Sequence, residues 1–179
     1  MVVCMKIKFR LLREEEIELR VGTCTEKGFT LLLYKDARCD MNILDETVGA
    51  MNWKREHTRD NKNCIVSIYD EDKKEWVSKE DTGTESFTEA EKGLASDSFK
   101  RACVNWGIGR ELYTSPKIWV SAEKNNIGID HKVVNGKHKY SPKQADLNLK
   151  VSKIEYNENG EIKSLSLSNK GKELDIYTR

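Results

Sequence analysis

The side chains best suited to binding chemistry are cations, and they occur in two groups. One group is the adjacent pair Lys100 and Arg101, in the middle of ASDSFKRACVNWGIG. The other is the basic run WKREHTR, which contains Lys54, Arg55 and Arg59. Cations fixed on a rigid element can hold an anion, and a row of them can follow a chain of phosphates. An ordinary solvated face would carry the same residues, so spacing alone leaves both interpretations open.

Other kinds of site chemistry have less support. The sequence contains no GxxxxGK[ST] phosphate loop, and its three histidines do not form HExxH or a comparable ligand pattern. His131 and His138 flank a predicted hairpin and could meet across it, although hairpin histidines are usually plain surface residues. No cysteine has a neighbouring histidine of the kind that activates a nucleophile. We therefore expect no catalytic site, no metal ion and no cofactor.

The segment that carries Lys100 and Arg101 is predicted to be an amphipathic helix. Thr88 and Glu91 fit a T-x-x-E capping box at its start, and Gly107 is a stop signal at its end. On a helical wheel, Lys100 and Arg101 flank a strip of small or short residues opposite the core side. The predicted core stripe consists of Ala95, Phe99, Ala102, Cys103 and Trp106.

Three predicted strands precede this helix. They are WKREHTR, NCIVSIYD and EWVSKEDTGT, and the polar turn EDKK joins the second to the third. Residues from about 53 to 84 therefore predict a three-stranded antiparallel meander. The centre of the chain has the order β-β-β-α.

The N-terminal part is predicted to begin with strands MKIKF and FTLLLY around a charged helical turn, REEEIELR. A short amphipathic helix should follow, with Asp40 as its N-cap and apolar positions that run from Ile43 to Met51.

The C-terminal part is predicted to be rich in β-strands. VVNGKHKY contains Asn135-Gly136, a strong hairpin signal, and a second hairpin is predicted about NENG. SPKQADLN reads as a loop, and ELDIY adds a further strand. We expect residues 1–116 to form a core and residues 117–179 to be a β-rich extension of the same domain.

Composition limits the function classes. The formal net charge is +1, from 31 basic and 30 acidic side chains, so a basic binding face would have to be segregated from acidic segments. There is no apolar run long enough to span a membrane, and the start MVVCMKIKFR is too short and basic for a signal peptide, with Met5 as a plausible natural start. Five cysteines without a CxxC pair fit a reducing compartment. We expect a cytoplasmic protein with no membrane partner.

Several of these segments resemble the single-strand annealing family, which includes the recombination mediator Rad52 and relatives in phages and prophages. The resemblance covers about residues 30–113 and lies in LLYKDARCDMNILDETVGAMNWKREHTR, CIVSIYD, VSKEDTGTES and EKGLASDSFKRACVNWGIGRELY. The most specific piece, ASDSFKRACVNWGIG, is similar to the family pattern a-x-D-x-x-K-R-a followed by an aromatic residue and glycine. The KEDTG turn is also similar, and the compact versions from prophages of Gram-positive bacteria are the nearest type.

The resemblance implies an α+β fold: a β-β-β-α annealing core of antiparallel sheet and packed helix, with a β-rich C-terminal extension, assembled into a ring or filament. It implies a protein that binds single-stranded DNA and anneals complementary strands in homologous recombination and double-strand break repair. This activity needs no ATP and no enzymatic step. The implied setting is the cytoplasm of a bacterial or phage-infected cell.

The same resemblance implies which cations meet the DNA backbone. These are Arg38, which stands in YKDARCDMN just before the first helix, together with Lys100 and Arg101. Val104 stands where the family has a further cation, and the basic residues Lys54, Arg55 and Arg59 could compensate for that loss. The implied partners are single-stranded DNA, further copies of this chain, and a phage exonuclease or a single-strand-binding protein.

Two other classes remain open from the residues alone. The chain could be a general or duplex-binding nucleic-acid module, although it has no helix-turn-helix pattern. It could also be a structural oligomer without annealing activity, in which Lys100 and Arg101 face acids such as Asp97 or Glu111.

Overall fold

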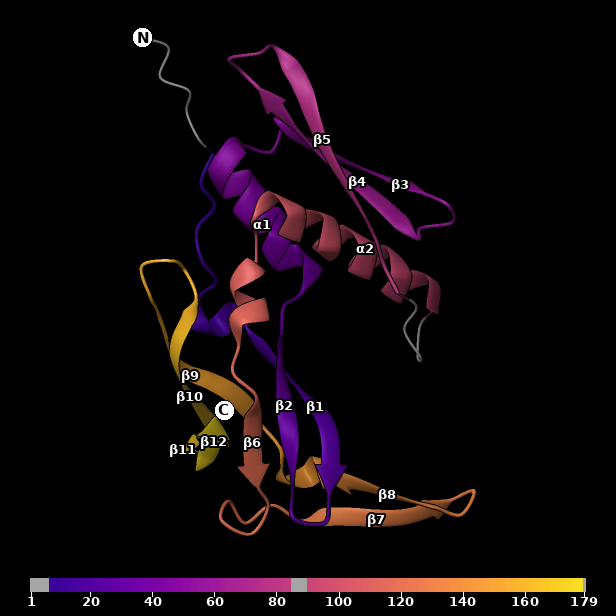
Figure 1. The fold of residues 1–179 in the computed structure, drawn as a ribbon, viewed down its shortest axis with the longest axis vertical. Helices are drawn as coiled ribbons and strands as arrows, with labels where there is room; N and C mark the ends of the chain where they lie inside the picture. Colours follow the sequence, from indigo (N-terminus) through magenta and orange to yellow (C-terminus); the bar gives the residue numbers. More distant parts are fainter. Residues whose placement is uncertain (1–6, 85–89, 179) are drawn as a thin grey trace. The chain divides into compact units, whose positions relative to one another are not determined.

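The computed structural model describes residues 7–84 and 90–178 of the chain, with side chains from residue 93 on in the second range (Figure 1). The chain divides into two compact units. Unit 1 consists of the described residues up to Leu11 and of Asp36–Arg110. Unit 2 consists of Leu12–Lys35 and of the described residues from Glu111 on. Both units contain antiparallel strands, and the described residues include two α-helices. The predicted α+β class is confirmed.

Unit 1 contains the predicted meander and the helix that follows it. Its elements are α1 (Ala37–Val48), β3 (Trp53–Thr58), β4 (Asn63–Asp70), β5 (Glu75–Thr82) and α2 (Ala90–Trp106). The strands form one antiparallel sheet in the order β3-β4-β5. Figure 1 shows α2 lying along one face of this sheet. The β-β-β-α order predicted from the sequence is therefore confirmed.

Local chemistry explains where these elements end. The turn between β3 and β4 places Arg59, Asp60 and Asn61 at positive φ, a conformation that Asn and Asp tolerate better than most residues. Gly107 has φ 109° directly after α2, which confirms it as the stop of that helix. The predicted capping box of Thr88 and Glu91 lies outside the described side chains.

The first helix starts earlier than predicted. Asp36, not Asp40, is its N-cap: Asp36 has an extended backbone, and its carboxylate accepts a hydrogen bond from Arg38 N at 2.9 Å. Asp40 lies within the first turn and is fully buried. The helix ends at Gly49, whose φ is 84°, so Met51 lies beyond its periodicity and is 88% exposed instead of joining the core.

Unit 2 holds the remaining strands and two short 3-10 turns. Its elements are η1 (Glu14–Glu16), β1 (Glu18–Thr25), β2 (Gly28–Tyr34), β6 (Ile118–Ser121), β7 (Ile129–Val134), β8 (Lys137–Pro142), η3 (Gln144–Asp146), β9 (Leu149–Tyr156), β10 (Ile162–Asn169), β11 (Lys172–Glu173) and β12 (Ile176–Thr178). A further turn, η2 (Arg110–Thr114), follows α2. The strands form three sheets in the orders β1-β2-β6-β12, β11-β10-β9 and β7-β8.

The N-terminal strand prediction is wrong in position. The described part of MKIKF, Ile7–Phe9, forms no strand, and β1 instead arises from Glu18–Thr25. Only Glu14–Glu16 of the predicted helical turn is helical. The reason is pairing: β1 hydrogen-bonds with β2 from Glu18 opposite Tyr34 to Thr25 opposite Gly28. The strand predicted at FTLLLY is confirmed as β2.

Both C-terminal hairpins are confirmed. Asn135 and Gly136 connect β7 to β8 with φ of 51° and 71°, as a two-residue turn with two positive φ values requires. β9 and β10 pair about the NENG turn.

β6 pairs with β2, so residues after 116 share a sheet with residues before it. The predicted division at residues 116 and 117 stays a prediction. Among the described helices, none is long and apolar enough to cross a membrane.

Candidate nucleic-acid interface

One face of the β3-β4-β5 sheet is covered by α2. Side chains alternate along a strand, so the antiparallel register identifies the residues that share this face. They are Trp53, Arg55, His57, Cys64, Val66, Ile68, Val77, Lys79 and Asp81. Two contacts from α2 identify the side: the Phe99 ring stacks on Trp53 with centroids 6.1 Å apart, and Trp106 Nε1 donates to the Val66 carbonyl at 3.0 Å.

Apolar burial holds α2 on this sheet. Phe99, Ala102 and Cys103 are fully buried, which confirms the centre of the predicted core stripe. Cys64 and Val66 of β4 are equally inaccessible on the facing side. Burying a side chain as large as Phe99 contributes about 1.5–3 kcal/mol, so the helix provides a rigid base for the charged groups around it.

Polar contacts fix α2 against the edge strand β5. Arg101 donates from Nε and Nη2 to Asp81 Oδ1, at 3.3 and 3.2 Å. Asn105 Nδ2 donates to the Glu80 carbonyl at 3.0 Å, and Lys79 Nζ donates to the Asn105 carbonyl at 2.8 Å. Lys79 also lies over the Trp106 ring, 4.5 Å from its centroid. Together these bonds set the position of α2 along the strand.

A second set of contacts joins the N-terminal half of α2 to the end of β5. Asp97 Oδ2 accepts bonds from Thr84 N and Thr84 Oγ1, at 2.9 and 3.2 Å. Gly83 approaches the helix so closely that a Cβ there would lie 2.5 Å from Ser98 N. The glycine of the KEDTG turn and the aspartate of the helix motif thus have a shared structural role, which sequence reasoning had not assigned to them.

Burial shifts the protonation of two groups on the helix-facing side. Burial lowers the pKa of His57, and the nearby Arg55 cation lowers it further, so the ring is neutral at pH 7. Burial raises the pKa of the Cys64 thiol to about 11, and Arg55 opposes that rise. Among the strand residues of this side, the cations Arg55 and Lys79 lie with one carboxylate, Asp81, and α2 adds Arg101 and Asp97.

The two arginines lie on opposite sides of α2. Arg55 belongs to β3 and Arg101 meets β5, and these strands flank the central β4. The Arg55 guanidinium lies over the Phe99 ring, 4.8 Å from the centroid, and it forms no ion pair within the described residues. The Arg101 side chain is 43% exposed, and its five N–H donors exceed the two groups that point to Asp81. Both cations can be reached from solvent.

Lys100 does not lie on an open face, contrary to the helical-wheel prediction. Its exposure is only 7%. The wheel treated α2 as a helix with one buried side, whereas α2 contacts both the sheet and α1. A second packing surface buries positions next to Phe99 that a single core stripe would leave in solvent. A role of Lys100 in binding remains a prediction, and it would act from a buried position.

The other three predicted cations are scattered. Lys54 lies on the opposite face of the sheet, 4.5 Å from the centroid of the Trp76 ring. Arg59 lies in the turn after β3 and is exposed. Arg38, in the first turn of α1, is 83% exposed and forms an ion pair with Asp36 at 3.3 Å. The structure thus brings Arg55 and Arg101 to the same side of the sheet but does not gather all six residues.

Two further cations near α2 were missed from the sequence. Lys79 follows Val77 by two positions in β5, so strand periodicity could have placed it on the helix-facing side. Arg110 Nη2 donates to the carbonyls of Val104 and Asn105, at 3.0 and 3.3 Å, and so caps the end of α2. Its position just after the glycine stop was the available signal.

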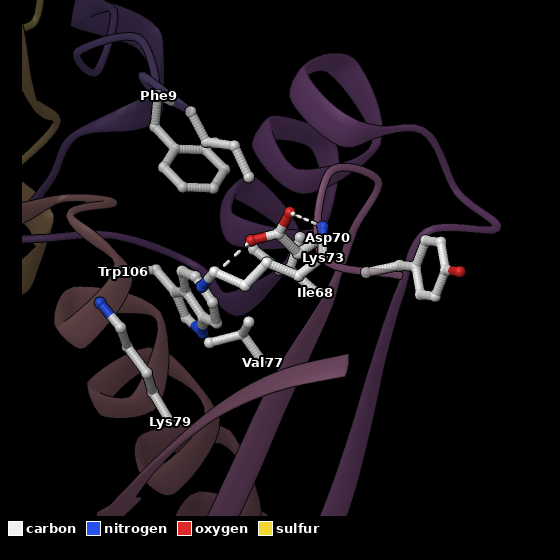
Figure 2. Close-up of a pocket in the computed structure, with 9 residues that line it drawn as sticks. Phe9, Ile68, Asp70, Lys73, Val77, Lys79 and Trp106 are labelled. Carbon is white, nitrogen blue, oxygen red and sulfur yellow. Dashed lines mark hydrogen bonds and ion pairs between the residues drawn. The ribbon is translucent and has the colours of Figure 1, made fainter. Parts of the chain in front are cut away.

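A pocket of about 400 Å³ opens beside the C-terminal end of α2 (Figure 2). Phe9, Val77 and Trp106 provide apolar walls, and Lys79 lies at its side. Lys73 is held by an ion pair with Asp70 at 3.3 Å. The pocket offers apolar surface and few convergent polar groups, so it does not define a small-molecule site.

No group of three metal-ligating side chains occurs in the part of the chain that the structure describes. The helix on its meander, with accessible arginines on both sides, defines a small rigid unit suited to contacts with a polyanion. The chain matches a known family over a span that includes part of this unit. Residues 63–129 match the sequence model of the Rad52/22 family double-strand break repair protein.

The family predicted from the sequence is therefore confirmed: this chain carries a segment of the Rad52/22 family, and the segment includes β4, β5 and α2. The match spans less than half of the chain and associates it with DNA repair and recombination. The prophage type stays a prediction. No curated protein and no solved structure matches the chain.

Proposed function

We propose that this chain binds single-stranded DNA and anneals complementary strands without ATP. The observation that carries the proposal is the family match at residues 63–129, which includes β4, β5 and α2 with the accessible Arg101. Arg55, on β3, lies outside the matched span and is added because it shares the helix-facing side of the sheet. In the proposed complex, Arg55 and Arg101 contact phosphates on either side of α2. Arg38, Arg59, Lys54 and Lys100 are proposed as further contributors.

The proposed mechanism needs alignment and charge neutralisation and no covalent step. Phosphate contacts position a strand without reading its sequence, which leaves the bases available to test a second strand. Each phosphate that a cation neutralises releases counterions, so affinity should fall as salt is added. In a plot of the logarithm of the binding constant against the logarithm of the salt concentration, each contacted phosphate of a single strand contributes a slope of about −0.7, and we call the total the salt slope. No nucleotide hydrolysis enters this scheme.

We further propose that several copies act together, as a ring or a filament. One copy offers few phosphate contacts, so its own affinity for DNA is weak. Tethering many such sites in one particle raises the effective affinity without any new kind of contact. A phage exonuclease or a single-strand-binding protein remains a proposed partner.

A pair of substitutions at one ion pair tests the proposed site. Arg101→Gln should reduce the affinity for a labelled oligothymidine about tenfold, which corresponds to about 1.4 kcal/mol. The magnitude of the salt slope should decrease by about 0.7 because one phosphate contact is lost. Asp81→Asn removes the negative charge with which Arg101 pairs but keeps a side-chain oxygen, so affinity should stay equal or rise. Fluorescence anisotropy across a salt series measures both quantities.

The two variants control for each other. Both break the same partly exposed ion pair, which is worth about 0–1 kcal/mol of stability, so both should fold like the unaltered chain. Thermal unfolding and particle mass verify that point. If Asp81→Asn weakens DNA binding as much as Arg101→Gln does, the pair has a structural role and the proposed contact is wrong.

A further inference from the structure

The hairpin of β7 and β8 has two chemically different faces. Its register places His131 opposite Tyr140, Lys132 opposite Lys139, and Val134 opposite Lys137. Side chains alternate along each strand, so Lys132, Lys137 and Lys139 share one face while the rings lie on the other. The two strands form a sheet of their own (Figure 1). Residues 130–139 are exposed, on both faces of this sheet.

We call Lys132, Lys137 and Lys139 the lysine face. Lys132 and Lys139 are directly opposite, a like-charge arrangement that destabilises an antiparallel pair. Within the described residues, none of the three forms an ion pair, and Asp130 at the base of the hairpin is the one acid on that face. The hairpin holds lysines that repel one another close together, so an anion that binds between them would stabilise it.

The opposite face stiffens the hairpin. The His131 and His138 rings are stacked with centroids 4.9 Å apart and an interplanar angle of 7°, and a ring-to-ring hydrogen bond of 2.8 Å joins Nε2 of His131 to Nδ1 of His138. Tyr140 extends the stack, with its centroid 4.9 Å from that of His131. A lone two-stranded hairpin is marginally stable in water. The ring stack therefore stiffens the exposed part of the hairpin, and contacts of β8 with β1 and β2 support the hairpin as well.

The spacing of the lysines suits one phosphate chain. Lys137 and Lys139 are two residues apart on one strand, about 7 Å, and Lys132 is about 5 Å across the sheet from Lys139. The two backbones that border a DNA major groove are about 12 Å apart, which is wider than this cluster. A single strand can place consecutive phosphates over the cluster.

We propose that the lysine face binds the phosphate backbone of single-stranded DNA, as a contact site in unit 2 that is separate from the arginines of unit 1. This inference rests on the proposed function. It concerns residues beyond the span 63–129 that matches the Rad52/22 family, so the family match does not assign it. The site would give each copy a second place to hold a strand.

The test compares two triple variants of the full chain. Lys132→Gln/Lys137→Gln/Lys139→Gln removes the lysine face. The matched control, Lys150→Gln/Lys163→Gln/Lys172→Gln, removes three exposed lysines from β9, β10 and β11 of the same unit. The first variant should lose at least tenfold in affinity for labelled oligothymidine, and its salt slope should shrink by about 2, which is three phosphates at about 0.7 each. The control should change by less than threefold.

The outcomes separate this inference from the proposed function. Equal affinities of the two triple variants, with Arg101→Gln still weaker than the unaltered chain, would overturn the lysine-face site and leave unit 1 as the binding site. If the lysine-face variant lost more affinity for double-stranded DNA than for oligothymidine, the assignment to single strands would be overturned. Absence of any DNA binding by the unaltered chain would overturn both proposals. Circular dichroism should show that both triple variants are folded like the unaltered chain, so that any difference in affinity arises from the hairpin charges.

Discussion

Burial has the largest influence on the chemistry of Cys64. This residue lies on β4 beneath α2, is fully inaccessible, and has a thiol pKa raised to about 11. The thiolate is the reactive form of cysteine, so Cys64 should be inert near neutral pH. Its position on the helix-facing side is a packing position, and it takes no part in the proposed contacts with DNA.

The raised pKa predicts how stability depends on pH. The folded chain holds the proton of Cys64 more tightly than the unfolded chain does, so the contribution is complete below the unfolded pKa of about 8.5 and is lost as pH rises toward 11. The loss should be about 2 kcal/mol between pH 8 and pH 10. Chemical denaturation at pH 8, 9 and 10 should show a smaller pH dependence for Cys64→Ala than for the unaltered chain. Identical pH dependences would contradict the prediction.

At the scale of elements, the junction between β5 and α2 locks the helix to the sheet. Asp97 binds Thr84 from the helix side, and Gly83 permits a contact with Ser98 that a larger residue would block. Both contacts lie within the motif segments that resemble the annealing family. Part of that motif therefore positions α2, and the remainder supplies cations.

Gly83→Ala tests this junction. The added methyl group would meet backbone atoms of α2, which cannot move without shifting the helix, so we expect a loss of about 1–3 kcal/mol in unfolding free energy. Gly128→Ala is the control, because the nearest atom to its new methyl group would be Cδ of Lys143, a flexible side chain that can move away. Denaturation followed by tryptophan fluorescence measures both. Equal losses for the two variants would mean that the close approach at Gly83 is not important.

The sequence predicts most of the elements because their signals are local. The alternation in NCIVSIYD, the Asn135-Gly136 turn and the Gly107 stop each determine structure within a few residues. The sequence predicts a helical turn where β1 begins, because three consecutive glutamates precede that strand. The strand forms there because it pairs with β2, and this pairing outweighs the local preference for a helical turn. The burial of Lys100 was missed for a similar reason, since it depends on how α2 packs in the whole unit.

At the scale of the whole molecule, overall charge gives little indication of a nucleic-acid partner. The formal net charge of +1 arises from nearly equal numbers of acids and bases, and the structure separates them locally. In unit 1 the arginines flank α2, and in unit 2 three lysines share one face of a hairpin. Each unit by itself presents a small basic surface, and neither would bind a strand tightly as a single copy.

Annealing of complementary strands can be followed in a single assay. Two complementary oligonucleotides with different dyes are mixed with the full chain in the absence of ATP, and pairing is followed by energy transfer while light scattering records particle mass. We expect faster pairing than in buffer alone, a steep decline of that acceleration with salt, and a particle of many copies. Pairing at the rate of the protein-free control, under conditions where the chain binds both strands, would contradict it.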